Sequence, residues 1–364
     1  MKGGNKMTNK MLVAFISAFI LLHPISAFAN DIWPIKNGTP QLTNFQNITL
    51  SNELFLKHEL DLSTLGNASE MLLNGDTLYS FNSTTVYATS LESKAILWEF
   101  TTPNQKDIRK IALVNGHIAV LTYDNLYLLK DESNNKSLVW EKNAGGNAIS
   151  FDDNQIFTYD ATTIRALNAQ TGDVKWSYTF PSTWEKFHSP ISNHGDKVYF
   201  VTDNQMEMNR KLYAMNKVTG KVLWTSNVDY YSQYPVVIGD KIILATHTEV
   251  TAYDANTGIF KWKKPLGSTY ASTFGDTFSG NQTTVFTRAY TGDLFAFDTA
   301  SGTQKFKVSF AENVPGRLYP EKNTTGPMLV MSNQVILENN GKLKFYDVTT
   351  GNHEHTISIP NVRL

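Results

Sequence analysis

The chain has 364 residues, of which 12% are aromatic and 18% charged, and it contains no cysteine. This composition excludes a disordered or collagen-like chain. The lack of cysteine excludes disulfides, thiol nucleophiles, cysteine-bound zinc, covalent c-type haem and a lipidated cysteine. The formal net charge of −1 gives no basic footprint for nucleic acid.

The N-terminus has the pattern of a secretory signal peptide. Lys2, Lys6 and Lys10 precede an apolar stretch over residues 11–22, and residues 27–29 fit a small-x-small cleavage site. The apolar run is too short to cross a bilayer, which needs about 20 residues. We predict a signal peptide over residues 1–29, cleaved after Ala29, and no transmembrane segment in the mature chain.

The mature chain is mildly acidic. Removing residues 1–29 removes three lysines and no acid, which leaves 29 basic and 33 acidic residues and a formal charge of −4. We divide the rest into a leader with a ring-closing strand over residues 30–66 and a repeat domain over residues 67–364.

A repeated motif runs through the second domain. Segments 167–176, 215–224 and 253–262 each begin with an apolar residue and Asn or Asp, then have Thr-Gly, and end in Trp four residues after the glycine. Segment 297–306 keeps the pattern with a terminal Phe, and segment 346–355 ends in His355. Two looser copies end at Trp98 and Trp140.

The repeat predicts a β-propeller. Successive anchors lie 36 to 49 residues apart, which suits a blade of four antiparallel strands, A to D from the axis to the rim. The segments between anchors are short and β-rich, which disfavours a helical solenoid. Seven units are visible between residues 68 and 359. We predict an all-β, seven-bladed propeller, with eight blades as the alternative, and a strand near residues 54–62 that closes the ring.

The fourth unit shows how a blade is interpreted. We expect strand A at 189–192, strand B at 197–202, strand C at 211–216 and strand D at 221–226. The glycine of the motif provides the positive φ of a tight C–D turn, and Asn or Asp caps that turn.

The aromatic residue on each D strand is expected to project into the neighbouring blade. Replacing such an indole by Ala costs about 3–5 kcal/mol. We therefore interpret these aromatic residues as structural docking residues: Trp98, Trp140, Trp176, Trp224, Trp262 and Phe306.

The motif resembles the pyrroloquinoline-quinone (PQQ)-type propeller repeat, as in residues 165–176 and 251–262. Trp33 and Pro34, followed by residues 54–62, are similar to the leader that often opens such proteins. The resemblance covers nearly all of residues 31–360. It implies the fold and the repeat type, whereas function depends on sites carried by the fold.

The D–A and B–C loops are expected to lie together on one face of the propeller, and they are irregular and rich in aromatic residues from the fourth blade onward. Irregular loops on a rigid scaffold are where binding usually occurs, through Tyr, Trp and Arg. We predict a binding face made of Trp184, Phe187, His188, Arg210, Tyr230, Tyr231, Tyr234, His247, Tyr270, Tyr290, Arg317 and Tyr319. Asp203, Met206 and Met208 lie in the same loops. The alternative is that these side chains only plug the channel.

Catalytic motifs are missing from the sequence, which contains no G-x-S-x-G, P-loop or G-x-G-x-x-G. His353 and His355 have chelating spacing without an obvious third ligand. Residues 131–135 imitate a calcium loop, but Lys136 replaces the required glycine. We expect no catalytic residue, no metal and no resident cofactor.

We therefore expect an exported binding or scaffold protein, a monomer that is secreted, cell-wall-associated or periplasmic. Its ligand would be a protein, a peptide or a glycan. One alternative, implied by the resemblance, is a quinoprotein dehydrogenase with PQQ and calcium. Against it, dehydrogenases of that family are similar to longer propellers with eight blades, and many carry an adjacent cysteine pair that this chain lacks. The other alternative is a periplasmic scaffold resembling the propeller subunit of outer-membrane protein assembly.

Overall fold

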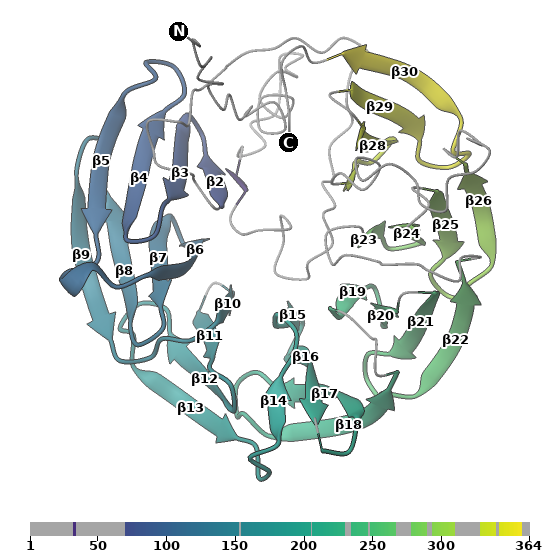
Figure 1. Cartoon of the computed structure of the whole chain (residues 1–364), viewed down its shortest axis with the longest axis horizontal. Coiled ribbons are helices and arrows are strands. Elements are labelled where there is room, and N and C mark those ends of the chain that lie inside the picture. The colour runs from purple at the N-terminus through teal and green to yellow at the C-terminus, as the bar shows by residue number, and fades with distance from the viewer. Residues whose placement is uncertain are drawn as a thin grey trace, which may run out of the picture.

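A computed structural model of the protein describes residues 32–33, 70–152, 154–204, 206–229, 234–246, 248–266, 278–289, 293–309, 328–339 and 342–358. Within these ranges the chain forms seven antiparallel sheets arranged in a ring (Figure 1). Each sheet has its last strand at the rim, and its other strands extend from there toward the centre. The prediction of an all-β, seven-bladed propeller is confirmed.

The first three blades follow the chain from its N-terminal side. Blade 1 contains β2 (Met71–Asn74), β3 (Thr77–Phe81), β4 (Thr85–Ser90) and β5 (Ile96–Thr101). After a turn of 3-10 helix, η2 (Pro103–Gln105), blade 2 contains β6 (Ile108–Val114), β7 (His117–Thr122), β8 (Leu126–Asp131) and β9 (Lys136–Lys142). Blade 3 contains β10 (Ala148–Phe151), β11 (Gln155–Tyr159), β12 (Thr163–Asn168) and β13 (Val174–Thr179).

Blade 4 has an additional strand. It contains β14 (Glu185–Phe187), β15 (Ser192–His194), β16 (Lys197–Asn204), β17 (Asn209–Asn216) and β18 (Val222–Val228). Both β14 and β15 pair with β16. The predicted strand A at 189–192 is wrong, because β15 begins only at Ser192. Pro190 has no N–H to donate to a ladder, which explains the later start.

The last three blades return to four strands each. Blade 5 contains β19 (Val236–Ile238), β20 (Lys241–Ala245), β21 (Glu249–Asp254) and β22 (Phe260–Pro265). Blade 6 contains β23 (Phe278–Asn281), β24 (Thr284–Arg288), β25 (Leu294–Asp298) and β26 (Gln304–Val308). Blade 7 contains β27 (Met328–Val330), β28 (Gln334–Asn339), β29 (Lys342–Asp347) and β30 (His353–Ser358).

The N-terminal side of the chain contributes a short strand to blade 1. β1 (Ile32–Trp33) pairs antiparallel with β2, with Ile32 opposite Asn74 and Trp33 opposite Leu73. The predicted signal peptide and the predicted strand near residues 54–62 lie outside the described residues. In the described part of the chain, no helix is long and apolar enough to span a membrane.

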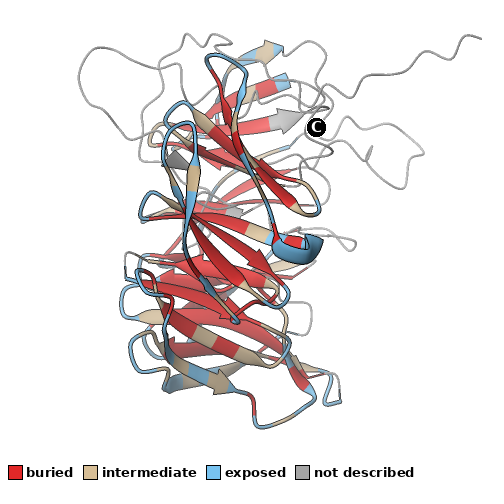
Figure 2. Cartoon of the chain, turned by 90° about the vertical axis from the view of Figure 1, so that its left-hand side faces the viewer, coloured by how far each residue is buried: buried red, intermediate tan, exposed pale blue. Residues whose placement is uncertain are grey.

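The hydrophobic core lies between the blades. Six clusters of buried residues each join two consecutive blades; for example, Phe157 and Ile164 of blade 3 pack with Phe200 of blade 4. The inner strands are therefore covered on both faces, and Figure 2 shows buried residues running along the strands. All of β20 is buried. D strands such as β18 alternate between exposed and half-buried residues, as expected at a rim.

A β-bulge precedes the docking position in every described blade. In blade 4, Ala214 pairs with Trp224 and Met215 pairs with Val222, so that Leu223 is the extra residue. The same shift occurs in the other six sheets. A bulge bends the strand and increases its local twist. Here it turns the side chain after the bulge toward the next blade.

The aromatic side chains of the D strands contact the following blade. Trp176 Nε1 donates to the carbonyl of Lys217 at 2.9 Å, and Trp262 Nε1 donates to the carbonyl of Thr299 at 3.0 Å. Blade 2 has no glycine in its C–D turn, and there Trp98 Nε1 donates to Asp131 Oδ1 at 2.9 Å. The Asp131 carboxylate therefore docks blade 1 onto blade 2.

The glycine of the motif has two roles. Gly220 has φ +68°, and a Cβ atom there would lie 2.5 Å from the ring of Trp176 in the preceding blade. The sequence predicted the positive φ, whereas the ring contact is visible only in the structure. The equivalent glycine–ring pairs are Gly172 with Trp140, Gly258 with Trp224, Gly302 with Trp262, and Gly351 with Phe306.

Candidate functional site

Blade 4 carries a lengthened hairpin on the D–A/B–C face. β16 and β17 are eight residues each, and their outer ends pair from Thr202 with Lys211 to Asn204 with Asn209. β14, which belongs to the D–A segment between blades 3 and 4, runs along this end, with Glu185 opposite Asn204. The D–A and B–C segments of blade 4 therefore form one continuous sheet extension.

The tip of this extension is apolar and exposed. Met206 and Met208, in the turn between β16 and β17, are 70% and 71% exposed. Trp184 is 53% exposed and directly precedes β14, so the register places it beside the same turn. We call Trp184, Met206 and Met208 the blade-4 tip.

Phe187, at the end of β14, packs against aromatic residues of blades 3 and 4. Its ring lies 4.3 Å from that of Tyr159 in a stacked arrangement, 4.6 Å from Phe200 and 4.8 Å from Phe180. Burial raises the pKa of the Tyr159 hydroxyl above its usual value. The structure thus places Phe187, a predicted binding residue, half-buried against the core between blades 3 and 4.

A buried carboxylate fixes β14 to the blade. Glu185 is 5% exposed, and its Oε1 accepts hydrogen bonds from Tyr213 Oη at 2.7 Å and from Thr202 Oγ1 at 2.9 Å. Burial, and then the bond to Glu185, raise the pKa of Tyr213 well above its usual value. Both hydroxyl groups therefore act as donors, and the carboxylate has hydrogen bonds to compensate its burial.

A second polar group lies at the base of the tip. Arg210 and Asp203 form a buried ion pair, with 3.8 Å between Nη2 and Oδ2. Burial, and then the positive charge of Arg210, lower the pKa of His188, although Asp203 opposes the shift. His188 Nε2, Asp203 Oδ1 and Asn209 Oδ1 are buried and have no hydrogen-bond partner among the described residues. The structure thus brings together His188 and Arg210, two of the predicted binding residues.

Of the other predicted residues of the face, Tyr234 alone lies within the described ranges. Tyr234 is half-buried, and it lies near enough to Tyr159 to contribute to the raised pKa of that residue. Seven further predicted residues lie outside the described residues: Tyr230, Tyr231, His247, Tyr270, Tyr290, Arg317 and Tyr319.

One exposed aromatic residue on the same face was not predicted from the sequence. Tyr123 is 64% exposed in the B–C turn of blade 2. A Cβ on Gly145 would lie 2.3 Å from the backbone of Asp124, so this D–A loop presses against the turn. The sequence signal was an aromatic residue directly after strand B in a blade where we had expected no site.

The motif of His353 and His355, which has metal-like spacing, makes other contacts in the structure. His353 Nε2 lies 2.9 Å from Thr356 Oγ1, and the ring of His355 stacks on Phe345 at 4.2 Å. In the described ranges, no group of three or more His, Cys, Asp or Glu side chains could hold a metal ion.

The fold and its docking motif define a class, that of PQQ-like repeat propellers. Residues 82–352 match the family model described as outer membrane protein assembly factor BamB. The match covers more than half of the chain, and the protein therefore belongs to this family.

Curated relatives match only parts of the chain. An uncharacterized protein RP232 of Rickettsia prowazekii is 25% identical over 224 residues, which is 54% of this chain and 53% of the relative. A quinoprotein ethanol dehydrogenase of Pseudomonas aeruginosa is 28% identical over 173 residues, covering 41% of this chain and 27% of the enzyme. The chain thus spans about half or less of the length of these relatives.

Solved structures show the same fold at low identity. BamB from Moraxella catarrhalis has a TM-score of 0.55 and 14% identity, covering 79% of this chain and 87% of that one. Quinohemoprotein alcohol dehydrogenase from Comamonas testosteroni has a TM-score of 0.60 and 13% identity, covering 95% and 75%. At such identity the likeness concerns architecture alone.

Proposed function

We propose that this protein is an exported, non-catalytic scaffold of the bacterial envelope that binds a protein partner through the D–A/B–C face. The observation that carries the proposal is the blade-4 tip. Exposed Trp and Met side chains on a protruding turn are typical of protein contacts, because they bury large apolar areas and adapt to a partner.

The support beneath the tip favours a preorganised contact. The Glu185 hydrogen bonds and the Phe187 ring cluster hold β14 against the hairpin, so little order has to be gained on binding. Rigid anchors lose less entropy on association than flexible ones. An apolar tip on a fixed base suits recognition of another protein better than recognition of a polar glycan.

The comparisons support the cellular setting of the proposal. The family description names an outer membrane assembly factor, and the signal-peptide pattern fits export to the same compartment. We therefore propose the periplasm as the location and a component of envelope assembly as the class of partner.

A site-specific cross-linking experiment tests the proposal. A photoreactive amino acid at Met206 in the full chain should give a discrete adduct in growing cells, whereas one at Ile259, which is exposed in a C–D turn of blade 5, should not. Replacing Trp184 and Met208 together by Ser should remove the Met206 adduct while the far-ultraviolet spectrum stays unchanged. An adduct that persists in the double variant, or that forms equally at Ile259, would show that the tip is not the binding surface.

A further inference from the structure

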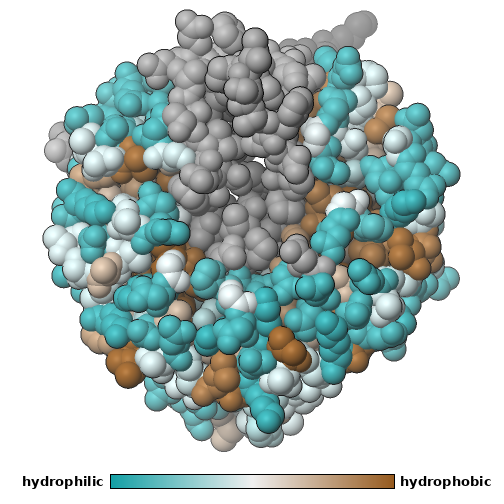
Figure 3. Space-filling view, turned by 180° about the vertical axis from the view of Figure 1, so that it is seen from behind, coloured by the Kyte–Doolittle hydropathy of each residue, from teal (hydrophilic) through white to brown (hydrophobic). Residues whose placement is uncertain are grey.

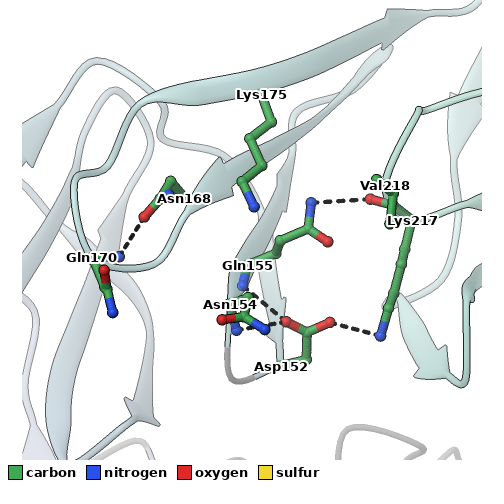
Figure 4. Close-up of a pocket in the computed structure, with 8 residues that line it drawn as sticks. All are labelled: Asp152, Asn154, Gln155, Asn168, Gln170, Lys175, Lys217 and Val218. Atoms are coloured by element: carbon green, nitrogen blue, oxygen red, sulfur yellow. Dashed lines mark hydrogen bonds and ion pairs between the residues drawn. The ribbon is translucent and has the colours of Figure 1, made fainter.

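A polar pocket of about 310 Å³ lies between blades 3 and 4, at the A–B and C–D turns and therefore away from the blade-4 tip (Figure 4). Blade 3 contributes most of its lining and blade 4 contributes one turn. The lining residues are Asp152, Asn154, Gln155, Asn168, Gln170, Lys175, Lys217 and Val218. No predicted site residue lies here.

One wall of the pocket is fixed by a residue that is unusual in the repeat. Lys217 occupies the position after the turn Asn, where blades 3, 5, 6 and 7 have Ala, Thr or Val. Its ammonium group lies 2.8 Å from Asp152 Oδ2, and its carbonyl accepts from Trp176 Nε1 at 2.9 Å and from Gln155 Nε2 at 3.0 Å. The charge of Lys217 is therefore neutralised within the protein.

Another wall of the pocket carries Lys175, which lacks the aspartate partner of the equivalent lysines in two other blades. Lys175 precedes the docking residue Trp176, and the lysines at the same position in blades 5 and 6 pair with an aspartate of their own turn. Lys261 lies 3.2 Å from Asp254, and Lys305 lies 3.8 Å from Asp298.

In blade 3 the turn residue is Asn168, which carries no charge. Lys175 forms no ion pair with any residue in the described ranges, and Figure 4 shows its side chain reaching into the space between Asn168 and Gln155. The pocket is thus lined by the Lys175 ammonium group, which lacks the turn aspartate that pairs with the equivalent lysine in blades 5 and 6.

We propose that this pocket binds the carboxylate of an acidic side chain on a peptide segment of another protein, with Lys175 as its counter-ion. The side-chain amides of Asn154 and Gln170 line the same space and can pair with peptide N–H and C=O groups (Figure 4). Val174 and Val218 are exposed beside it and can contact apolar neighbours of the acidic residue. Seen from behind in Figure 3, the described surface is largely hydrophilic with scattered hydrophobic patches.

A titration with a defined peptide tests the proposal. The probe is an acetylated, amidated tripeptide of valine, glutamate and valine, added to the ¹⁵N-labelled full mature chain, with the glutamine analogue as its neutral counterpart. We expect saturable shifts of the amide signals of Asn154, Gln170 and Val218, weaker at high salt. The glutamine peptide should cause none. Equal binding of both peptides, or acetate that shifts these signals as strongly as the peptide, overturns the proposal.

Three single variants distinguish a specific loss of peptide binding at Lys175 from a general change in the fold. Lys175→Gln should weaken the peptide affinity about fivefold, as expected for one exposed ion pair. Asn168→Asp should have a similar effect, because it restores the internal carboxylate that Asp254 provides in blade 5. Lys261→Gln, the same change in blade 5, should leave the affinity unchanged. Unaltered affinity in both blade-3 variants would overturn the proposal, and their folding is checked by the spectrum of the remaining amides.

Discussion

At the scale of single residues, the C–D turn explains why the motif has its composition. Asn216 Oδ1 accepts hydrogen bonds from the backbone N–H groups of Val218 and Thr219 and from the Thr219 hydroxyl. Asp254 makes the same three contacts in blade 5. The side chain replaces a backbone partner and fixes the turn, which is why Asn and Asp are interchangeable there.

The glycine contact gives a prediction at this scale. Gly220→Ala should lower the free energy of unfolding by about 2–4 kcal/mol, because the new methyl group meets both an unfavourable φ and the Trp176 ring. Gly195→Ala is the matched control, since Gly195 also has a positive φ but nothing lies within 4 Å of its Cβ position. It should cost about 1–2 kcal/mol. Urea unfolding measures both, and equal losses would refute the ring contact.

At the scale of strands, blade 7 shows how the docking position tolerates a change. In five blades an alanine lies opposite the docking aromatic residue, as Ala214 lies opposite Trp224. In blade 7 the pair is Phe345 and His355, whose rings stack at 4.2 Å. A large residue on strand C thus compensates for a smaller residue on strand D. Because the two side chains fill one packing space, the effects of substitutions at the two positions on the free energy of unfolding should be coupled.

A double-mutant cycle tests this coupling. Phe345→Ala should destabilise the protein by about 3–5 kcal/mol and His355→Trp by about 1–3 kcal/mol. The double variant restores the Ala–Trp pair of the other blades. It should be less destabilised than the sum of the single variants by about 1–3 kcal/mol in thermal or urea unfolding. Strict additivity would mean that the two rings do not share a packing site.

Strands were also where the sequence-based prediction was incomplete. The fourth blade was predicted with strands B, C and D at 197–202, 211–216 and 221–226, and the structure extends B to Asn204, begins C at Asn209 and continues D to Val228. The added strand β14 was not predicted. Its pairing with β16 joins segments about 17 residues apart, and no local pattern in residues 185–187 specifies such a partner.

At the scale of the whole molecule, the free energy of unfolding should depend on pH and fall in acid. Hydrogen bonds from Ser301 and Thr350 lower the pKa of Asp298 and Asp347. For Asp254, burial acts to raise the pKa, but bonds from Thr257, Lys261 and backbone amides outweigh it and lower the pKa to about 2. Burial lowers the pKa of His188 and His194. All these groups bind protons more weakly in the folded state than in the unfolded state.

The sign of the pH dependence follows. Where the unfolded chain binds more protons, the free energy of unfolding falls as the pH falls. The loss should begin below about pH 6.5, from the histidines, and steepen below about pH 4, from the aspartates. Replacing Asp254, Asp298 and Asp347 together by Asn should make the loss between about pH 4 and 2 shallower while the turns persist, as Asn168 and Asn216 show. Urea unfolding at stepped pH measures it, and an unchanged slope would contradict the assignment.

The sequence by itself determined the architecture, because blades 3 to 7 repeat a local code and blades 1 and 2 keep its terminal Trp. The Asn or Asp, the Gly and the aromatic residue act within one turn and one strand, and the repeat period sets the blade size. The tertiary structure decided where surfaces form. The bulge that aims each aromatic side chain, the glycine–ring contacts and the tip supported by Glu185 and Phe187 all depend on pairing between segments far apart in sequence. Within the described ranges, the lack of an ion pair at Lys175 also depends on the tertiary structure, whereas Asn168 in place of Asp254 or Asp298 can be read from the sequence.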